Sequence, residues 1–512
     1  MKFSLFAVSV LPYLVNADNN SVRRLSFEKI AGYAPGSQVT DHCAIDLDQQ
    51  AIEFELAKAT DDSFALAKRI YNQGAHSKSY ADITLSSGLT TSVNKGKAMI
   101  GKDSQGRDVA GVAFETYQAG TTAIRFEYGT SDIQTSYVNC QVGALGEAGN
   151  LDGCIAANGS ITIEGSNYGY TYDPATNNDN GRTIAGFSTE AGQKMRTDCP
   201  GCPYTDFMYF KDYYGVDDYA NQWVTAALDG TATSFDNGDA DFSRYSFAGR
   251  SEAVKKGTVF MNIFMYVIRE FEDALDDCKK DCIDCNDDPV HAWDEGVCFY
   301  TGSIEGKDGL TSNGKLLHQL ADKRCINFKT CGQNSGELSG TAKVNYDLFQ
   351  KYELGKQQLE SSQCDAARIT TAEVTKLMYI PFIQGTLRYA YKLDALNEGE
   401  KSAAEGATFA AAVLPRIHAA SPEAAQTIYD NMKVGATSTS FSDVKAAFES
   451  VYSDLGITCR DIGGLWNEAL DEYYGGMEPC GGAFSAATTS TTSSKAMIVA
   501  ITGAAALFVG FF

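Results

Sequence analysis

Apolar residues recur every three or four positions through much of this chain, a period that predicts amphipathic helices. The clearest run, at residues 252–275, carries eight apolar side chains at this spacing, so one face of that helix is expected to lie in a core. A second run, at residues 371–393, contains Pro381, which should kink it. Further helices are predicted at residues 45–71, where Gly74 closes one or two helices, and at 346–360, 402–418, 422–432, 441–452 and 465–473.

The pattern changes between residues 82 and 172, where glycine and threonine are frequent and apolar and polar residues alternate. Alternation at residues 123–128 and 160–164 predicts short strands, and therefore a small β-rich insert within the helical sequence. Two short echoes indicate an internal duplication, since residues 295–299 (EGVCF) resemble 405–409 (EGATF) and residues 70–82 resemble 428–443. The predicted fold class is α+β, predominantly helical, with internally duplicated helical bundles and a β-rich insert.

The two ends of the chain have the composition of targeting segments. Residues 1–17 combine a basic start, an apolar run and a small-x-small site, which predicts a signal peptide, because the apolar run is too short for a transmembrane helix. The remaining organisation is predicted as a first helical lobe at 18–335 with the insert at about 80–172, a second helical lobe at 336–480, a Ser/Thr-rich spacer at 481–495 and a hydrophobic segment at 496–512.

The hydrophobic segment at residues 496–512 carries no charge and follows a small, polar spacer. This order is typical of a glycolipid (GPI) anchor signal, in which case the segment is removed. A transmembrane helix is the alternative, although seventeen residues are at the short limit for spanning a bilayer. Either form of attachment predicts a location on the outer face of the plasma membrane.

Charge and cysteine content limit the classes of function. The 65 acidic residues exceed the 42 basic ones, and the net charge of −23 argues against nucleic acid as a partner, while it suits a cation ligand or solubility alone. The 14 cysteines predict multiple disulfides in an oxidising compartment, and a zinc cluster is the less favoured alternative for the closely spaced ones. Asn158 lies in a glycosylation acceptor sequence.

Three residues of one predicted helix could bind a metal ion together. His291 follows a proline and two aspartates that suit a helix start, and it is followed by Asp294 at i+3 and Glu295 at i+4. This spacing places an imidazole and two carboxylates on one helix face, as in the metal sites of helical bundles. The alternative is that the carboxylates only favour the helix N-terminus and face water.

Additional ligands are expected to be oxygen atoms, because the chain has only five histidines but 27 tyrosines. The candidate ligands are Glu270, Tyr300, His76 and Tyr80. In the ordinary interpretation these residues are surface carboxylates or tyrosines at the edge of the core. In the functional interpretation they bind the metal ion. The chain has no nucleophile elbow, zinc helix, phosphate loop or dinucleotide fingerprint. We therefore expect a protein that is not an enzyme, and a secreted metal-dependent hydrolase is disfavoured.

Residues 291–332, which begin HAWDEGVCFYTG, and residues 74–80 (GAHSKSY) resemble conserved blocks of the algal iron-assimilation proteins. Within that family the resemblance is to the phytotransferrins, the iron-starvation-induced surface proteins of diatoms. It implies Fe³⁺ binding at the cell surface with carbonate as synergistic anion, then endocytosis with surface or endocytic partner proteins and release in acidified vesicles. A carbonate needs a cationic partner, for which the candidates by chemistry are Arg269, Arg324 and Arg388.

A structural or adhesive acidic glycoprotein of the cell surface, with no role in metal uptake, is the alternative function. In that case the acidity would serve solubility and the histidine-containing segment would serve packing. The two hypotheses differ in whether the purified protein takes up iron.

Overall fold

The computed structural model describes residues 29–37, 39–74, 80–102, 106, 108–128, 155–156, 158–171, 182–279 and 289–480. The predicted signal peptide, the spacer and the hydrophobic segment at 496–512 lie outside these ranges and stay predictions. Among the helices that the structure describes, none is both long enough and apolar enough to cross a membrane.

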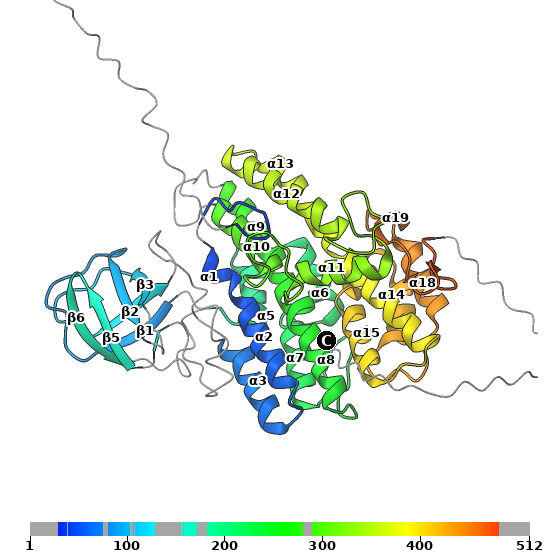
Figure 1. Cartoon of the computed structure of the whole chain (residues 1–512), viewed down its shortest axis with the longest axis horizontal. Helices are drawn as coiled ribbons and strands as arrows, with labels where there is room; N and C mark the ends of the chain where they lie inside the picture. The colour runs from blue at the N-terminus through cyan, green and yellow to red at the C-terminus, as the bar shows by residue number, and fades with distance from the viewer. Residues whose placement is uncertain are drawn as a thin grey trace, which may run out of the picture.

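The described chain is predominantly helical, as predicted, and the helices form one body (Figure 1). Its helices are α1 (Thr40–Cys43), α2 (Ile45–Leu56), α3 (Asp61–Gln73), α5 (Gly186–Thr189), α6 (Thr205–Tyr214), α7 (Tyr219–Asp229), α8 (Phe247–Gly257), α9 (Phe264–Cys278), α10 (Pro289–Thr301), α11 (Leu317–Phe328), α12 (Lys343–Glu360), α13 (Cys364–Met378), α14 (Ile380–Asp394), α15 (Glu400–Ala411), α16 (Leu414–Ala420), α17 (Pro422–Met432), α18 (Phe441–Val451) and α19 (Cys459–Ile462), with π-helical segments η3 (Gln193–Thr197) and η4 (Thr258–Ile263).

The strongest predicted helix, at residues 252–275, is confirmed as part of a rod formed by α8, η4 and α9 in succession. Every residue of η4 is buried, so the rod runs through the centre of the helical body. Prolines divide two other predicted helices. Pro381 lies in the first turn of α14, directly after α13, and Pro415 lies in the first turn of α16, so the predicted helix at 402–418 is interrupted after Ala411.

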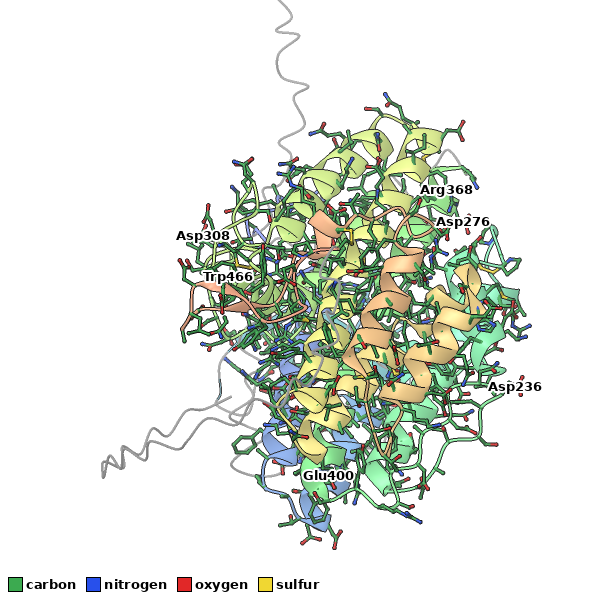
Figure 2. The ribbon with its side chains drawn as sticks, turned by 90° about the vertical axis from the view of Figure 1, so that its right-hand side faces the viewer. Asp236, Asp276, Asp308, Arg368, Glu400 and Trp466 are labelled. Atoms are coloured by element: carbon green, nitrogen blue, oxygen red, sulfur yellow. A yellow bond between two sulfur atoms is a disulfide. The ribbon has the colours of Figure 1, made fainter. Side chains whose placement is uncertain are left out.

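The predicted helix at residues 465–473 is wrong. This segment forms a short hairpin of β7 (Trp466–Asn467) and β8 (Glu472–Tyr473), in which Trp466 lies opposite Tyr473. The Asn467 side chain accepts a hydrogen bond from the backbone of Ala469 and stabilises the turn, and Leu470, whose spacing suggested a helix, is 66 % exposed. Trp466 lies at one edge of the helical body (Figure 2).

The predicted β-rich insert is confirmed as a closed antiparallel barrel beside the helical body (Figure 1). Its strand order is β1-β4-β3-β2-β5-β6, and Ile161 and Phe126 are fully buried inside it. Glu164 and Gly165 both have positive φ and form the two-residue turn between the last two strands. The strands are β1 (Tyr80–Leu85), β2 (Ala98–Lys102), β3 (Asp108–Ala113), β4 (Ala123–Tyr128), β5 (Asn158–Ile163) and β6 (Ser166–Thr171).

Multiple disulfides are present, as predicted, and two of them connect helices that are distant in the sequence. Cys43–Cys298 joins α1 to α10 across 255 residues, and Cys278–Cys364 joins α9 to α13. The other pairs in the described ranges are Cys199–Cys202, Cys325–Cys331 and Cys459–Cys480. Buried residues from both predicted lobes belong to one apolar cluster, and the predicted boundary at residue 335 stays a prediction.

Candidate metal centre

Helix α10 brings His291 and Glu295 together. Pro289 occupies the first position of α10, where the missing N–H of proline costs nothing, so the helix begins there. Residues 291 and 295 therefore lie one turn apart on the same face of the helix. His291 Nε2 lies 3.0 Å from Glu295 Oε1. The predicted i, i+4 pair therefore exists, with the imidazole half-exposed and the carboxylate nearly buried.

A second histidine, His42 of α1, completes the cluster. The Cys43–Cys298 disulfide holds α1 against α10, and His42 Nε2 lies 2.5 Å from Glu295 Oε1. The ligand atoms of His42, His291 and Glu295 all lie within 4.8 Å of one another, and no other group of three histidines, cysteines or acidic residues does so in the part of the chain that the structure describes. Two imidazoles and a carboxylate form a familiar ligand set for iron and zinc.

Asp294, the third residue of the predicted group, faces a different segment. Its carboxylate accepts hydrogen bonds from the Tyr33 hydroxyl at 2.5 Å, from the backbone of Gly36 and Ser37 at 2.8 Å each, and from Ser37 Oγ at 2.8 Å. Ser37 Oγ also lies 3.1 Å from His291 Nδ1. Asp294 thus supports His291 through Ser37, which leaves Nε2 directed at Glu295, an arrangement typical of the outer partners of metal-bound histidines.

The charges around Glu295 keep it ionised. Burial alone would raise the pKa of Glu295, but His42, His291 and Arg182 outweigh this effect and hold that pKa well below its usual range. Arg182 Nη2 lies 4.0 Å from Glu295 Oε1 and also contacts His42 Nε2. The carboxylate is thus available as an anionic ligand, and a guanidinium group lies at the edge of the cluster.

Helix α9, which packs along α10, adds a second carboxylate and a cation. Glu270 is 1 % exposed, and its Oε2 accepts a hydrogen bond from Arg269 Nη1 at 2.6 Å, whereas Oε1 has no hydrogen-bond partner among the described residues. Burial raises the pKa of Glu270 to about 7; Arg269 opposes this rise and Glu295 adds to it. One sequence candidate, Glu270, thus lies within electrostatic reach of Glu295, and a second, Arg269, is paired with Glu270.

Tyr266, one turn before Glu270, is a phenol in the same environment. Its buried ring stacks on Phe187 at a centroid distance of 3.8 Å, and Lys194 Nζ lies 3.5 Å from its hydroxyl. Burial raises the pKa of Tyr266, Glu270 and Glu295 raise it further, and Lys194 opposes them. The α9 side of the cluster therefore carries a phenol and a carboxylate together with two cations.

The remaining sequence candidates lie elsewhere or outside the described residues. Tyr300 is buried on the opposite part of α10 and donates to Asn345 Oδ1 at 2.7 Å. Tyr80 begins β1, where its backbone pairs with Glu127, and His76 lies outside the described ranges. Three further candidates are distributed over other elements: Arg324 on α11, Arg388 on α14 and Asn158, which is exposed at the start of β5.

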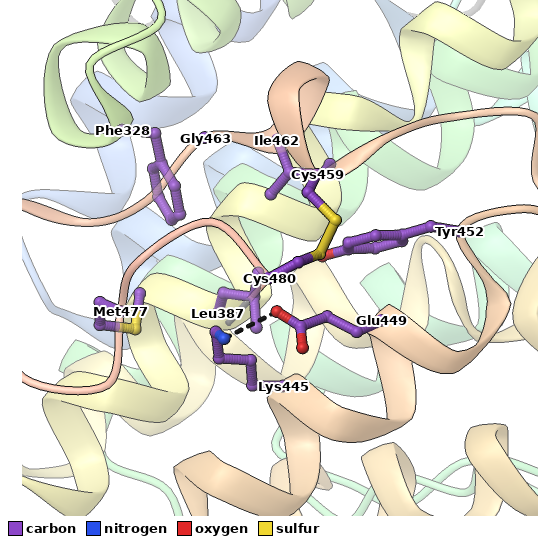
Figure 3. Close-up of a pocket in the computed structure, with 10 residues that line it drawn as sticks. All are labelled: Phe328, Leu387, Lys445, Glu449, Tyr452, Cys459, Ile462, Gly463, Met477 and Cys480. Atoms are coloured by element: carbon purple, nitrogen blue, oxygen red, sulfur yellow. Dashed lines mark ion pairs between the residues drawn. A yellow bond between two sulfur atoms is a disulfide. The ribbon is translucent and has the colours of Figure 1, made fainter. Parts of the chain in front are cut away.

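Thiolate ligation can be set aside for the described cysteines, because all of them are in disulfides. The hollow shown in Figure 3 is also unrelated to the cluster. It is lined largely by apolar side chains, the Cys459–Cys480 disulfide and the ion pair of Lys445 with Glu449, whose atoms are 2.7 Å apart. It offers no group of metal ligands.

His42, Arg182 and Tyr266 are the members of the site that the sequence patterns do not reveal. His42 precedes His291 in the chain by about 250 residues, and the Cys43–Cys298 disulfide and the packing of α1 on α10 bring the two together. The helical spacing could have indicated Tyr266, because it precedes Glu270 by four residues on the most strongly predicted helix. The two side chains therefore lie on the same face of that helix.

Comparison with known families assigns the chain. The profile of the low iron-inducible periplasmic proteins matches residues 199–489, more than half of the chain. The matched region contains Tyr266, Glu270, His291 and Glu295, whereas His42 precedes it. No curated protein and no solved structure matches the chain. The chain belongs to the family of low iron-inducible periplasmic proteins.

Proposed function

We propose that this chain is a non-enzymatic, cell-surface Fe³⁺-binding protein of the phytotransferrin type, and that His42, His291 and Glu295 bind the ion. The observation that carries this proposal is the convergence of the three ligand atoms within 4.8 Å in a member of an iron-responsive family. The hydrogen bond between Ser37 and His291 Nδ1 supports it, because it orients Nε2 toward the cluster.

Two imidazoles and one carboxylate would also suit Zn²⁺ or Fe²⁺, so the preference for Fe³⁺ rests on further oxygen donors. Tyr266 is the donor we assign, since a phenolate is a hard anionic ligand and Lys194 lies beside its hydroxyl. With a bidentate carbonate, these four residues would complete six coordination positions. Arg182 and Arg269 are the cations that would bind the carbonate.

Acid would release the ion from this set of ligands. Imidazole binds a metal ion only in its neutral form, so protons compete with the ion for both histidines as the pH falls, and they also compete for the phenolate. Each competing imidazole lowers the affinity by up to about tenfold per pH unit below its pKa. This behaviour fits capture at the surface, attachment through the C-terminal segment and release after endocytosis.

The proposal is tested by equilibrium dialysis of the metal-free protein against Fe³⁺, with and without bicarbonate. We expect tighter binding with bicarbonate, and loss of binding in the double variant His291→Ala/Glu295→Ala. The matched control is His418→Ala/Glu423→Ala, which removes the same residue types from α16 and α17. Equal iron uptake by both double variants would refute the assignment of the site.

A spectroscopic measurement tests the preference for Fe³⁺. A phenolate bound to Fe³⁺ gives a visible charge-transfer absorption, which should appear on iron loading and disappear in Tyr266→Phe. If the iron-loaded protein has no such band, or if Zn²⁺ displaces the iron at equal concentration, the centre is not the ferric site proposed here.

A further inference from the structure

Two arginines from different helices lie over one pair of stacked aromatic rings. Tyr389 of α14 and Phe409 of α15 stack at a centroid distance of 5.8 Å and an interplanar angle of 14°. Arg324 Cζ lies 6.0 Å from the Phe409 centroid, and Arg388 Cζ lies 5.0 Å from the Tyr389 centroid. Lys392 Nζ is also 5.2 Å from the Tyr389 ring. Three cations therefore gather around a single pair of rings.

Glycines at the contact between α14 and α15 allow this arrangement. A Cβ atom at Gly385 would lie 2.7 Å from the Phe409 ring, and one at Gly406 would lie 2.9 Å from Tyr389 Cβ. The two helices thus approach closely enough for the rings to stack, and the cations that contact the rings come from α11 and α14.

Among the described residues, neither guanidinium group has a counter-ion within ion-pair distance. Within the described ranges, Arg324 and Arg388 make no hydrogen bond and no ion pair with a carboxylate, although the chain has 65 acidic residues. Arg324 is only 7 % exposed, and its Nε has no hydrogen-bond partner. Lys392, in contrast, is paired with Glu398 at 2.8 Å. Buried guanidinium groups are normally paired, so the unpaired Arg324 needs an explanation.

Glu405 is the carboxylate whose charge reaches both arginines, and it is already engaged. It lies 3.6 Å from Lys256 Nζ and shares a hydrogen bond with Glu252. Burial raises the pKa of Glu405 to about 7, with Lys256 opposing and Glu252 reinforcing this rise. At neutral pH it therefore carries only part of a negative charge and does not neutralise two guanidinium groups.

The contacts with the aromatic rings do not stabilise the two arginines fully. Burial lowers the pKa of Arg324 to about 9, and repulsion from Arg388 contributes to this. A cation–ring contact stabilises a guanidinium group by much less than the cost of removing that ion from water. The rings therefore offset only part of the cost of burying Arg324 beside the charge of the half-buried Arg388, and a bound anion would supply the remainder.

We propose that Arg324 and Arg388 form a binding site for a small oxyanion, such as phosphate, sulfate, bicarbonate or a carboxylate, separate from the centre at His42, His291 and Glu295. The planar fork of each guanidinium can donate two parallel hydrogen bonds to such an anion. Arg324 and Arg388 lie on α11 and α14, and neither helix contributes a residue to the group of His42, His291 and Glu295.

The test measures thermal unfolding and calorimetric binding of the full ectodomain with phosphate, sulfate, acetate or bicarbonate, each against chloride at constant ionic strength. We expect at least one oxyanion to raise the melting temperature and to bind in the calorimeter. Arg388→Gln should weaken that binding at least tenfold and abolish the increase in melting temperature. Comparing the tetrahedral with the planar anions identifies the preferred ligand.

A second variant and an anion-free measurement separate a binding site from a structural one. Without oxyanion, Arg388→Gln should be at least as stable as the natural protein, because it removes one of two repelling cations. The exposed residue Arg244, changed to Gln, is the control and should keep the anion response. The inference is overturned if no oxyanion binds, or if Arg388→Gln lowers the anion-free melting temperature and retains the response. Iron binding should be unchanged in Arg388→Gln.

Discussion

Two adjacent carboxylates on α10 have different roles, so changing each to its amide should separate metal binding from folding. Glu295 faces His42 Nε2 at 2.5 Å and His291 Nε2 at 3.0 Å, and Glu295→Gln removes the anionic ligand of the cluster. Loss of an outer partner of a metal ligand typically weakens binding 10–100-fold. Loss of a ligand should cost at least the upper value, about 100-fold or about 2.8 kcal/mol.

Asp294→Asn acts mainly on stability. Asp294 Oδ2 accepts hydrogen bonds from the backbone of Gly36 and Ser37, and Oδ1 accepts one from Tyr33. An asparagine has only one accepting oxygen, so it leaves either the backbone donors or the tyrosine unpaired, at about 1–3 kcal/mol for each donor. Because the amide oxygen can stay with the backbone donors and leave only the Tyr33 hydroxyl without its acceptor, the free energy of unfolding should fall by about 1–3 kcal/mol, with a smaller effect on iron affinity than Glu295→Gln.

Competition with a chelator gives the iron affinity of each variant, and urea unfolding of the metal-free protein gives its stability. The matched pair controls for the loss of one negative charge on the same helix turn. If Asp294→Asn weakens iron binding as strongly as Glu295→Gln while stability is unchanged, then Asp294 is the ligand and the assignment is wrong.

Three further predictions concern the scaffold. Replacing Cys43 and Cys298 together by Ser opens a loop of 255 residues, which should lower the free energy of unfolding by up to about 5 kcal/mol in urea and weaken iron binding, because His42 loses its anchor. Burial raises the pKa of Asp46 to about 7, so the folded protein favours the protonated carboxyl group. This preference contributes about 4 kcal/mol to the free energy of unfolding below pH ~4, and the contribution is lost as the pH rises through 7. Asp46→Asn should therefore flatten the decline in stability between pH 5 and 8. Gly355→Ala places a Cβ 2.1 Å from the Trp293 ring and should lower the melting temperature by an amount equivalent to about 1–3 kcal/mol.

The helical period predicted much of the fold because it follows from burial of one face. Residues 252–275 and 422–432 lie in helices at these positions, and alternation located the barrel. The segment 465–473 misled the same reasoning, because the spacing of its apolar residues is helical but Leu470 faces solvent. The conformation of this short segment, which lies within the loop closed by the Cys459–Cys480 disulfide and next to glycines, is determined by its turns and not by the spacing of its apolar residues.

The candidate site was only half predictable. The spacing of His291 and Glu295 within one helix is local information, so the sequence could place them together. His42 approaches them only through one of the many pairings that 14 cysteines allow, and no pattern in the sequence selects that pairing. Asp294 was expected beside them, but the chain near Gly36 binds its carboxylate instead.

The most direct measurement is an anomalous-scattering map from crystals of the protein soaked with iron and bicarbonate. The account predicts an iron peak bounded by His42 Nε2, His291 Nε2 and the Glu295 carboxylate, with anion density toward Arg182. A peak at another group of residues, or no iron peak in crystals that retain this arrangement, would contradict it.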